Sequence, residues 1–484
     1  MKKEISQLEP KSVWKNFSAI NAIPRASKKE QQVSDFMVAF GQNLGLETSR
    51  DKALNVLIKK PASPGFENRK KVTLQSHLDM VHQKNNDTKF DFTTQGIEMY
   101  IANDWVTAKG TTLGADNGMG VAAIMSILED KKIQHPALEA LFTIDEETGM
   151  TGAFELTPNF ISGDILLNLD TEEDHEITIG CAGGIDITAK KEYTPFLIPE
   201  NQPVFKITLN GLQGGHSGMD IHKGLGNANL ILVRFLYQLQ QKVNFQLISF
   251  SGGNLRNAIP REAEALISPS NEMEFTDACE AIAEEIRQEW SVKEPNITFG
   301  LSPQTYQKQG LSPIDQHTFL QTVYSCHNGV YTMDAAIANL VATSNNLASV
   351  TAANGTIEIA CLTRSSIETE KKDLVQKLSS TFDLGGFEVQ TSGSYPGWQP
   401  KPHSEIVQLM SNIYQTLFNE APEVNACHAG LECGIIGEPY PTMEMVSFGP
   451  TIRGAHSPDE KVSIPSVQKF WCFLQEILKN IPVK

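Results

Sequence analysis

The sequence has few cysteines and no long apolar run, and each shortage excludes a class of protein. No apolar stretch approaches the roughly 20 residues that a membrane-spanning helix needs. The charged start, Met-Lys-Lys-Glu, has no apolar segment behind it, so we expect no secretory signal. The seven cysteines contain no Cys-x-x-Cys pair, which argues against a structural zinc site or a disulfide framework. We therefore expect free thiols in a cytoplasmic protein without a membrane partner.

Basic residues are also in short supply. The chain has 40 Lys and Arg against 57 Asp and Glu, a formal net charge of −17. Binding of nucleic acid without sequence preference needs basic surface, so no nucleic-acid partner is expected. Hydrophobic residues make up 40% and charged residues 20% of the sequence, which is typical of a globular protein. The 484 residues are enough for two or three domains.

Strand and helix patterns alternate over the first third of the chain and change near Gly183-Gly184. Alternation of this kind predicts an α/β fold, with a mainly parallel sheet sandwiched by helices. Beyond the glycine pair the pattern predicts an α+β domain, and Tyr395–Pro400 reads as a linker out of it. We expect one domain made from residues 1–185 and 395–484, with residues 186–394 inserted. The segments that carry this prediction are strands 54–59, 72–76, 141–144, 165–169, 204–209 and 443–448, and helices 29–46, 118–128, 227–243, 404–418 and 466–480.

Side chains that can bind metals follow four of the predicted strands, three of them directly and the fourth, 443–448, through the loop that carries His456. Open parallel sheets bind ligands at the carboxyl ends of their strands, so these side chains are expected at one edge. A fifth segment, the glycine-rich loop that holds Asp116, precedes a predicted helix and points to the same edge. Imidazole and carboxylate together suit zinc, and also cobalt or manganese. The residues concerned are His77, Asp79, Asp116, Glu146, Glu147, Asp170 and His456.

Two metal ions about 3.5–4 Å apart need one bridging carboxylate and further ligands for each ion. Asp116 is the best bridge, because a tight glycine loop can place it between strands. His77 and Asp170 would complete one ion, and Glu147 and His456 the other.

Two carboxylates have supporting roles in this prediction. Asp79 shares a strand face with His77 and can accept its far N–H. Adjacent Glu146 and Glu147 cannot both take one role, so one binds metal and the other is free to take a proton from water.

Five short motifs resemble those of the dizinc superfamily of carboxypeptidases, aminoacylases and dipeptidases. Further stretches are similar to bacterial aminoacyl-histidine dipeptidases, a family also called peptidase D, and this resemblance spans nearly the whole chain. The superfamily motifs are Ser76–Met80, Gly114–Gly118, Asp145–Gly149, Gly214–Gly218 and Gly454–Pro458. The stretches similar to the narrower family are Thr111–Asp116, Gly180–Gly184, Leu255–Pro260, Tyr395–Gln399 and His428–Gly434.

The resemblance implies roles that the residues alone leave open. It implies Glu146 as the catalytic general base, Glu147 as a metal ligand and Asp79 as the catalytic-site residue that orients His77. It implies a cis peptide after Asp116. It also implies a dimetal aminopeptidase-like fold in which the inserted domain is a lid that helps to form a homodimer.

Three residues of the inserted domain are candidates for substrate binding. His216 lies in a glycine-rich loop, and its role rests mostly on the resemblance. Arg364 follows a predicted strand, and a guanidinium is a natural partner for a free carboxylate. Asn257 is the third candidate.

The expected function is the hydrolysis of dipeptides, including Xaa-His dipeptides such as beta-alanyl-histidine. Two divalent metals, expected to be zinc, would activate the attacking water, with Glu146 as the base. A deacylase or a carboxypeptidase stays open as an alternative, because these enzymes share the metal ligands. A non-catalytic binding protein on a decayed hydrolase scaffold is the other alternative, and the intact Glu146 speaks against it.

Overall fold

The computed structural model describes residues 4–156, 159–200, 202–305, 307 and 309–484, and the chain divides into two compact units. The first unit holds residues 1–180, 400–426 and 431–484. The second holds residues 181–399 and 427–430. The expected division into one domain made from residues 1–185 and 395–484 and an inserted domain at 186–394 stays a prediction.

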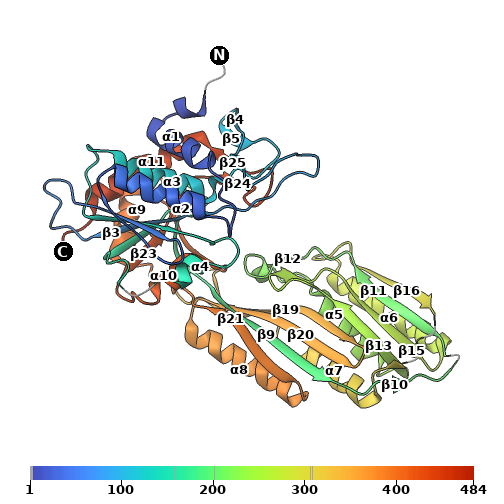
Figure 1. Cartoon of the computed structure of the whole chain (residues 1–484). Helices are drawn as coiled ribbons and strands as arrows, with labels where there is room; N and C mark the ends of the chain where they lie inside the picture. Colours follow the sequence, from blue (N-terminus) through green and yellow to red (C-terminus); the bar gives the residue numbers. More distant parts are fainter. Residues whose placement is uncertain (1–3, 157–158, 201, 306, 308) are drawn as a thin grey trace. The chain divides into compact units, whose positions relative to one another are not determined.

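An eight-stranded sheet in the order β1-β2-β6-β3-β7-β23-β8-β22 forms the centre of the first unit (Figure 1). The four strands β6, β3, β7 and β23 are parallel to one another. Strands β1 and β2 are antiparallel at one edge, and β8 runs antiparallel to β23. The predicted α/β fold with a mainly parallel central sheet is confirmed. The strands span β1 Glu47–Arg50, β2 Val56–Lys60, β3 Val72–His77, β6 Leu138–Thr143, β7 Ile165–Asn168, β8 Glu176–Cys181, β22 Glu423–Cys427 and β23 Glu444–Ser447.

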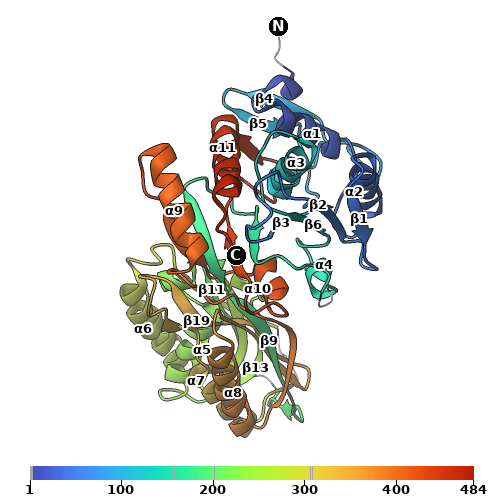
Figure 2. The same ribbon diagram turned by 90° about the vertical axis from the view of Figure 1, so that its left-hand side faces the viewer.

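Helices cover this sheet. Helix α3 packs against β3, and α1 packs against α3. Helix α9 packs against β23 and α11 (Figures 1 and 2). Helix α3 can approach the sheet closely because Gly120 has no side chain: a Cβ there would lie 2.4 Å from Ser76 Oγ and 2.7 Å from Leu169 O. The helices span α1 Lys11–Asn21, α2 Gln31–Asn43, α3 Ala115–Glu129, α4 Thr151–Phe154, α9 Glu405–Phe418, α10 Glu432–Gly437 and α11 Ile464–Asn480, with a 3-10 turn at Ile5–Gln7.

A second, four-stranded sheet of the first unit joins distant parts of the sequence. Its order is β24-β25-β5-β4, and all its strand pairs are antiparallel. The strands span β4 Met99–Ala102, β5 Trp105–Ala108, β24 Ile452–Arg453 and β25 Lys461–Ser463. This sheet brings the segment after β23 against the segment that leads into α3.

The second unit is an antiparallel sheet in the order β16-β11-β15-β13-β19-β20-β9-β21, with β18 paired to β19. Helices α5 to α8 pack on it, and their apolar faces make one buried cluster with the strands. The elements span β9 Gly183–Glu192, β11 Val204–Asn210, α5 Ala228–Leu239, β13 Phe245–Gly252, β15 Ala263–Pro269, α6 Glu272–Trp290, β16 Thr298–Gln304, α7 Pro313–Ser325, β18 Gly329–Met333, β19 Val341–Ala353, β20 Thr356–Ser365, α8 Glu368–Leu384 and β21 Glu388–Tyr395.

Side-chain caps fix the starts of several helices. Asn227 accepts hydrogen bonds from the backbone N–H of Asn229 and Leu230 at the start of α5, and Asn271 and Ser312 cap α6 and α7 in the same way. Two short pairs complete the second unit. They are β10 Phe196–Leu197 with β17 Gln309–Gly310, and β12 Gly215–His216 with β14 Ala258–Ile259, besides a 3-10 turn at Ile221–Lys223. Among the described residues, no helix combines the length and apolarity that crossing a membrane requires.

Candidate metal centre

His77 is the last residue of β3, and carboxylates face both of its ring nitrogens. Nε2 lies 3.1 Å from Asp116 Oδ1 and 3.4 Å from Asp170 Oδ1, while Nδ1 lies 3.4 Å from Asp79 Oδ1. Burial lowers the pKa of His77, but the charge of Asp170 and hydrogen bonds with Asp116, Asp170 and Asp79 outweigh it and raise this pKa well above its usual value. Asp79 therefore orients the imidazole through Nδ1, while Nε2 faces Asp116 and Asp170.

Asp116 presents one carboxylate oxygen to each of two histidines. Oδ1 faces His77, and Oδ2 lies 3.3 Å from His456 Nε2, which is itself 3.0 Å from Glu147 Oε2. Hydrogen bonds with Asp116 and Glu147 raise the pKa of His456 to about 11. The peptide between Asp116 and Asn117 is cis, so that prediction is confirmed.

Two of the groups formed by possible ligand atoms share Asp116. One group is His77, Asp116 and Asp170, and the other is Asp116, Glu147 and His456. Within each group the ligand atoms all lie within 4.8 Å of one another. Two groups joined by one carboxylate are what a pair of metal ions with a single bridging ligand requires.

The donor chemistry fits divalent cations. Glu147 Oε1 is buried and has no hydrogen-bond partner among the described residues. Burial raises the pKa of both Glu147 and Asp170. A buried carboxylate oxygen without a partner is costly, and a cation at this place would satisfy it. Since imidazole and carboxylate ligands suit zinc, cobalt and manganese, the residues present fit a pair of such ions.

Glu146 and Glu147 follow β6, and Asp79 fixes the backbone of both. The N–H of Glu146 donates to Asp79 Oδ1 at 3.0 Å, and the N–H of Glu147 donates to Asp79 Oδ2 at 3.3 Å. Burial and the negative charges of Asp170, Glu432 and Glu147 raise the pKa of Glu146 well above its usual value, although the charge of His77 opposes this. A carboxyl group with a raised pKa is a stronger base than an ordinary carboxylate, which suits it to accept a proton.

A row of buried polar side chains crosses the four parallel strands below the candidate ligands. Thr143 of β6, Gln75 of β3, Asn168 of β7 and Ser447 of β23 are hydrogen-bonded in that order. At one end of the row, Glu432 of α10 accepts hydrogen bonds from Gln75 Nε2 and Thr143 Oγ1, both at 2.7 Å.

From the sequence, Glu432 is only a weak site candidate in the glycine-containing stretch His428–Gly434. The signal that could have pointed to this row is the position of Gln75 and Asn168, each two residues before a candidate ligand in a strand. Residues two apart in a strand share a face, so a polar pair there indicates a polar layer under the site.

The three candidates for substrate binding all lie in the second unit. His216 on β12 stands beside β14, and the N–H of Ser217 donates to Asn257 O at 2.8 Å. Arg364, near the end of β20, donates from Nε to Ser217 Oγ at 3.3 Å and from Nη1 to Tyr395 Oη at 2.9 Å. The structure thus links His216, Asn257 and Arg364 through Ser217.

A buried histidine, His428, belongs to the same cluster. Its Nε2 lies 2.7 Å from Ser344 Oγ. Burial and the charge of Arg364 lower the pKa of His428 to about 3, and the same two causes lower the pKa of His216. Both histidines are therefore disfavoured as cations beside the guanidinium of Arg364.

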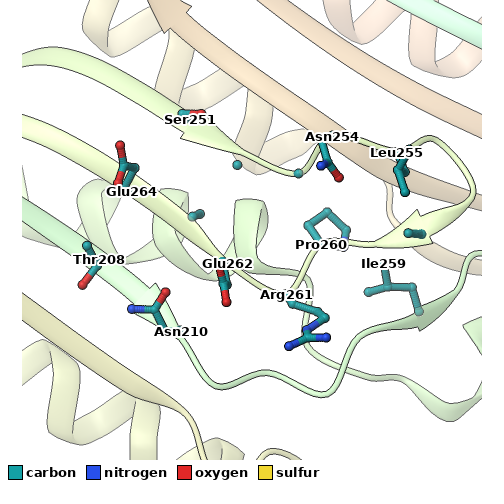
Figure 3. Close-up of a pocket in the computed structure, with 14 residues that line it drawn as sticks. Thr208, Asn210, Ser251, Asn254, Leu255, Ile259, Pro260, Arg261, Glu262 and Glu264 are labelled. Carbon is teal, nitrogen blue, oxygen red and sulfur yellow. The ribbon is translucent and has the colours of Figure 1, made fainter. Parts of the chain in front are cut away.

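A separate pocket of about 520 Å³ lies in the second unit (Figure 3). Figure 3 shows Asn254 and Leu255 on one rim and Arg261 and Glu262 on the other. Its lining contains none of the candidate metal ligands or substrate-binding residues.

Comparison with known proteins connects this geometry to a family. The chain is 45% identical to the cytosol non-specific dipeptidase of Escherichia coli (strain K12), over 99% of this chain and 100% of that protein. The crystal structure of aminoacylhistidine dipeptidase from Vibrio alginolyticus superimposes with a TM-score of 0.94 at 43% identity, covering 100% of this chain and 99% of that chain.

A more distant likeness concerns the fold alone. Aminopeptidase PepT from Bacillus cereus has a TM-score of 0.57 at 14% identity, covering 98% of this chain and 99% of that chain. The model of peptidase family M20/M25/M40 matches residues 73–480, which include every candidate metal ligand. The predicted resemblance and the prediction of a peptidase are both confirmed: the chain belongs to peptidase family M20/M25/M40.

Proposed function

We propose that this chain hydrolyses dipeptides with the help of two divalent metal ions. The observation that carries the proposal is the pair of ligand groups sharing Asp116, with Glu146 beside them. The names of the two full-length relatives, a non-specific dipeptidase and an aminoacylhistidine dipeptidase, support the choice of dipeptides.

The candidate ligands are His77, Asp116 and Asp170 for one ion, and Asp116, Glu147 and His456 for the other. Zinc is the expected ion, with cobalt and manganese as alternatives. When bound, the metal pair would acidify a water molecule and polarise the amide carbonyl.

Glu146 supplies the proton transfers in this proposal. Its carboxylate takes a proton from the attacking water and then gives it to the leaving amine, which are the two tasks of one general acid–base group. The raised pKa of Glu146 makes its carboxylate a stronger base and so favours the first transfer. Asp79 acts through its neighbours, because it holds the ring of His77 and the backbone of Glu146 in place.

Substrate recognition is assigned to the second unit. We propose that Arg364 pairs with the free carboxylate of the dipeptide, since a guanidinium binds a carboxylate through two parallel hydrogen bonds. His216 and Asn257, linked to Arg364 through Ser217, would contact the rest of the substrate. We further propose that Xaa-His dipeptides are among the substrates, that the second unit forms a homodimer, and that the protein works in the cytoplasm.

The proposal is tested with a substrate panel on metal-depleted protein, before and after zinc or manganese is restored. The panel compares Xaa-His and other dipeptides, tripeptides and N-acyl amino acids by kcat/KM. We expect hydrolysis of dipeptides only after metal is restored. Faster hydrolysis of N-acyl amino acids would replace the dipeptidase by a deacylase, and full activity after exhaustive chelation would reject the metal-dependent mechanism.

A further inference from the structure

Glu460 is a buried carboxylate that binds four consecutive backbone N–H groups. Oε2 accepts from Leu113 at 2.7 Å and from Gly114 at 2.8 Å, and Oε1 accepts from Ala115 at 2.7 Å and from Asp116 at 3.2 Å. The residue is only 2% exposed. The carboxylate of Glu460 thus fixes the backbone of the loop that carries Asp116, although the two residues are 344 positions apart in the sequence.

The main chain around Glu460 is equally well fixed. The N–H of Glu460 donates to Ser457 O at 3.1 Å, and the N–H of Ser457 donates to Gly454 O at 3.1 Å, so the loop that carries His456 is closed on itself. Thr107 Oγ1 donates to Glu460 O at 2.8 Å, which ties this loop to β5. Glu460 therefore joins the His456 loop to the Asp116 loop.

A buried arginine holds the other side of the Asp116 loop. Arg25 donates from Nη2 to Gly114 O, and from Nη1 to Leu78 O at 3.0 Å and Asp79 O at 3.1 Å. In the Asp116 loop, the carbonyl of Gly114 therefore accepts from the guanidinium of Arg25, and the N–H groups donate to the carboxylate of Glu460. No ion pair joins Glu460 to a basic residue within the described part of the chain, so its burial is compensated by backbone donors.

We propose that Glu460 is a positioning residue for the metal pair, which sets the separation between Asp116 and His456. The inference rests on the proposed metal-dependent function and deepens it. The Asp116 loop has a second anchor in Arg25, whereas the hydrogen bonds of Glu460 join this loop to the loop that carries His456, in addition to the contact of 3.3 Å between Asp116 Oδ2 and His456 Nε2. The group made of Asp116, Glu147 and His456 should therefore depend on Glu460 more than the group that contains His77 and Asp170.

The test is zinc binding to metal-depleted protein, measured by chelator competition, in Glu460→Gln. Glutamine keeps the size of the side chain but offers its N–H₂ to backbone donors in place of one oxygen. Groups that orient metal ligands from outside typically contribute 10–100-fold in metal affinity. We expect the weaker zinc-binding step to lose about 10–100-fold, the stronger step to change less, and excess zinc to restore most of kcat.

Asp459→Asn is the matched control. Asp459 is the exposed neighbour of Glu460, so this substitution removes the same charge without touching the buried carboxylate. Zinc affinities of Glu460→Gln within twofold of that control, or an equal loss in both steps, would overturn the inference. If Glu460→Gln does not fold, Glu460→Asp decides, since the shorter acid keeps the charge but cannot reach all four N–H groups. Failure of the wild-type protein to bind two zinc ions would reject the proposed function instead, so the two failures are distinguishable.

Discussion

At the scale of single residues, the candidate site separates two neighbouring carboxylates by what surrounds them. Glu147 Oε2 lies 3.0 Å from His456 Nε2, whereas burial and the charges of Asp170, Glu432 and Glu147 raise the pKa of Glu146 well above its usual value. These different surroundings suit Glu147 to bind a cation and Glu146 to transfer protons.

The first prediction follows from that division. Glu146→Gln should keep zinc bound and lower kcat by about 10²–10⁴, because general acid–base catalysis contributes about that much and glutamine has no basic oxygen. Glu147→Gln should instead lose zinc, as elemental analysis of the purified protein will show. Activity of Glu146→Gln within a few-fold of the wild type would mean that another group is the base.

The second prediction concerns His428, whose pKa is lowered to about 3 by burial and by Arg364. Below the unfolded pKa of about 6.5, the unfolded chain takes up a proton that the folded chain refuses. Folding stability should then fall by about 1.4 kcal/mol per pH unit as the pH drops from about 6.5 toward 3.

Urea unfolding of the wild type and of His428→Gln at pH 7.5 and pH 5 measures how much of the pH dependence of the free energy of unfolding comes from His428. Glutamine does not titrate, so the loss of stability between the two pH values should be smaller in the variant by about 2 kcal/mol. Equal losses in both proteins would show that His428 is protonated in the folded state at pH 5.

At the scale of elements, regular patterns were predictable and short contacts were not. The helix predicted at 29–46 is α2, Gln31–Asn43, and the strand predicted at 443–448 is β23, Glu444–Ser447. Strands β24 and β25 were missed because two or three residues carry no periodicity. His77, Glu147 and Asp170 were recognisable because they lie at or just after the ends of strands, and Asp116 and His456 because they lie in short glycine-containing motifs. Glu460 was not, because its partners are backbone N–H groups far away, which no spacing in the sequence reveals.

The third prediction tests the packing of α3 on the sheet. Gly120→Ala places a methyl group 2.2 Å from Asn117 Oδ1, 2.4 Å from Ser76 Oγ and 2.7 Å from Leu169 O. The backbone oxygen cannot turn away, so overpacking should cost about 1–3 kcal/mol despite the better helix propensity of alanine. Thermal unfolding of the metal-depleted protein measures this loss of stability. A variant as stable as the wild type would contradict the close packing of α3 on the sheet.

At the scale of the whole molecule, the candidate metal ligands and the candidate substrate-binding residues belong to different units. His77, Asp116, Glu147, Asp170 and His456 all lie in the first unit. His216, Asn257 and Arg364 lie in the second. Metal affinity and substrate selectivity should therefore respond to different sets of substitutions.

The fourth prediction applies that separation to Arg364. Arg364→Ala should leave zinc content unchanged and lower the ratio of kcat/KM for dipeptides over tripeptides by about 10–100-fold. A hydrogen bond to a charged group contributes about 1.5–3 kcal/mol, and about 1.4 kcal/mol is tenfold. Arg261→Ala, an exposed arginine of the same unit, is the control. Loss of zinc in Arg364→Ala, or efficient cleavage of tripeptides by the wild type, would contradict this role.

The place of β23 in the central sheet sets an order on biosynthesis. This strand, residues 444–447, lies between β7 and β8, which are made more than 260 residues earlier. While the ribosome is still translating the segment before it, the edges of β7 and β8 have no partner between them. Unpaired strand edges attract other chains. The antiparallel sheet of the second unit, residues 183–395, is complete much sooner. The segment that is synthesised first, residues 1–180, thus completes its sheet last, so we expect the strand edges of this segment, rather than those of the second unit, to be exposed to other chains during synthesis.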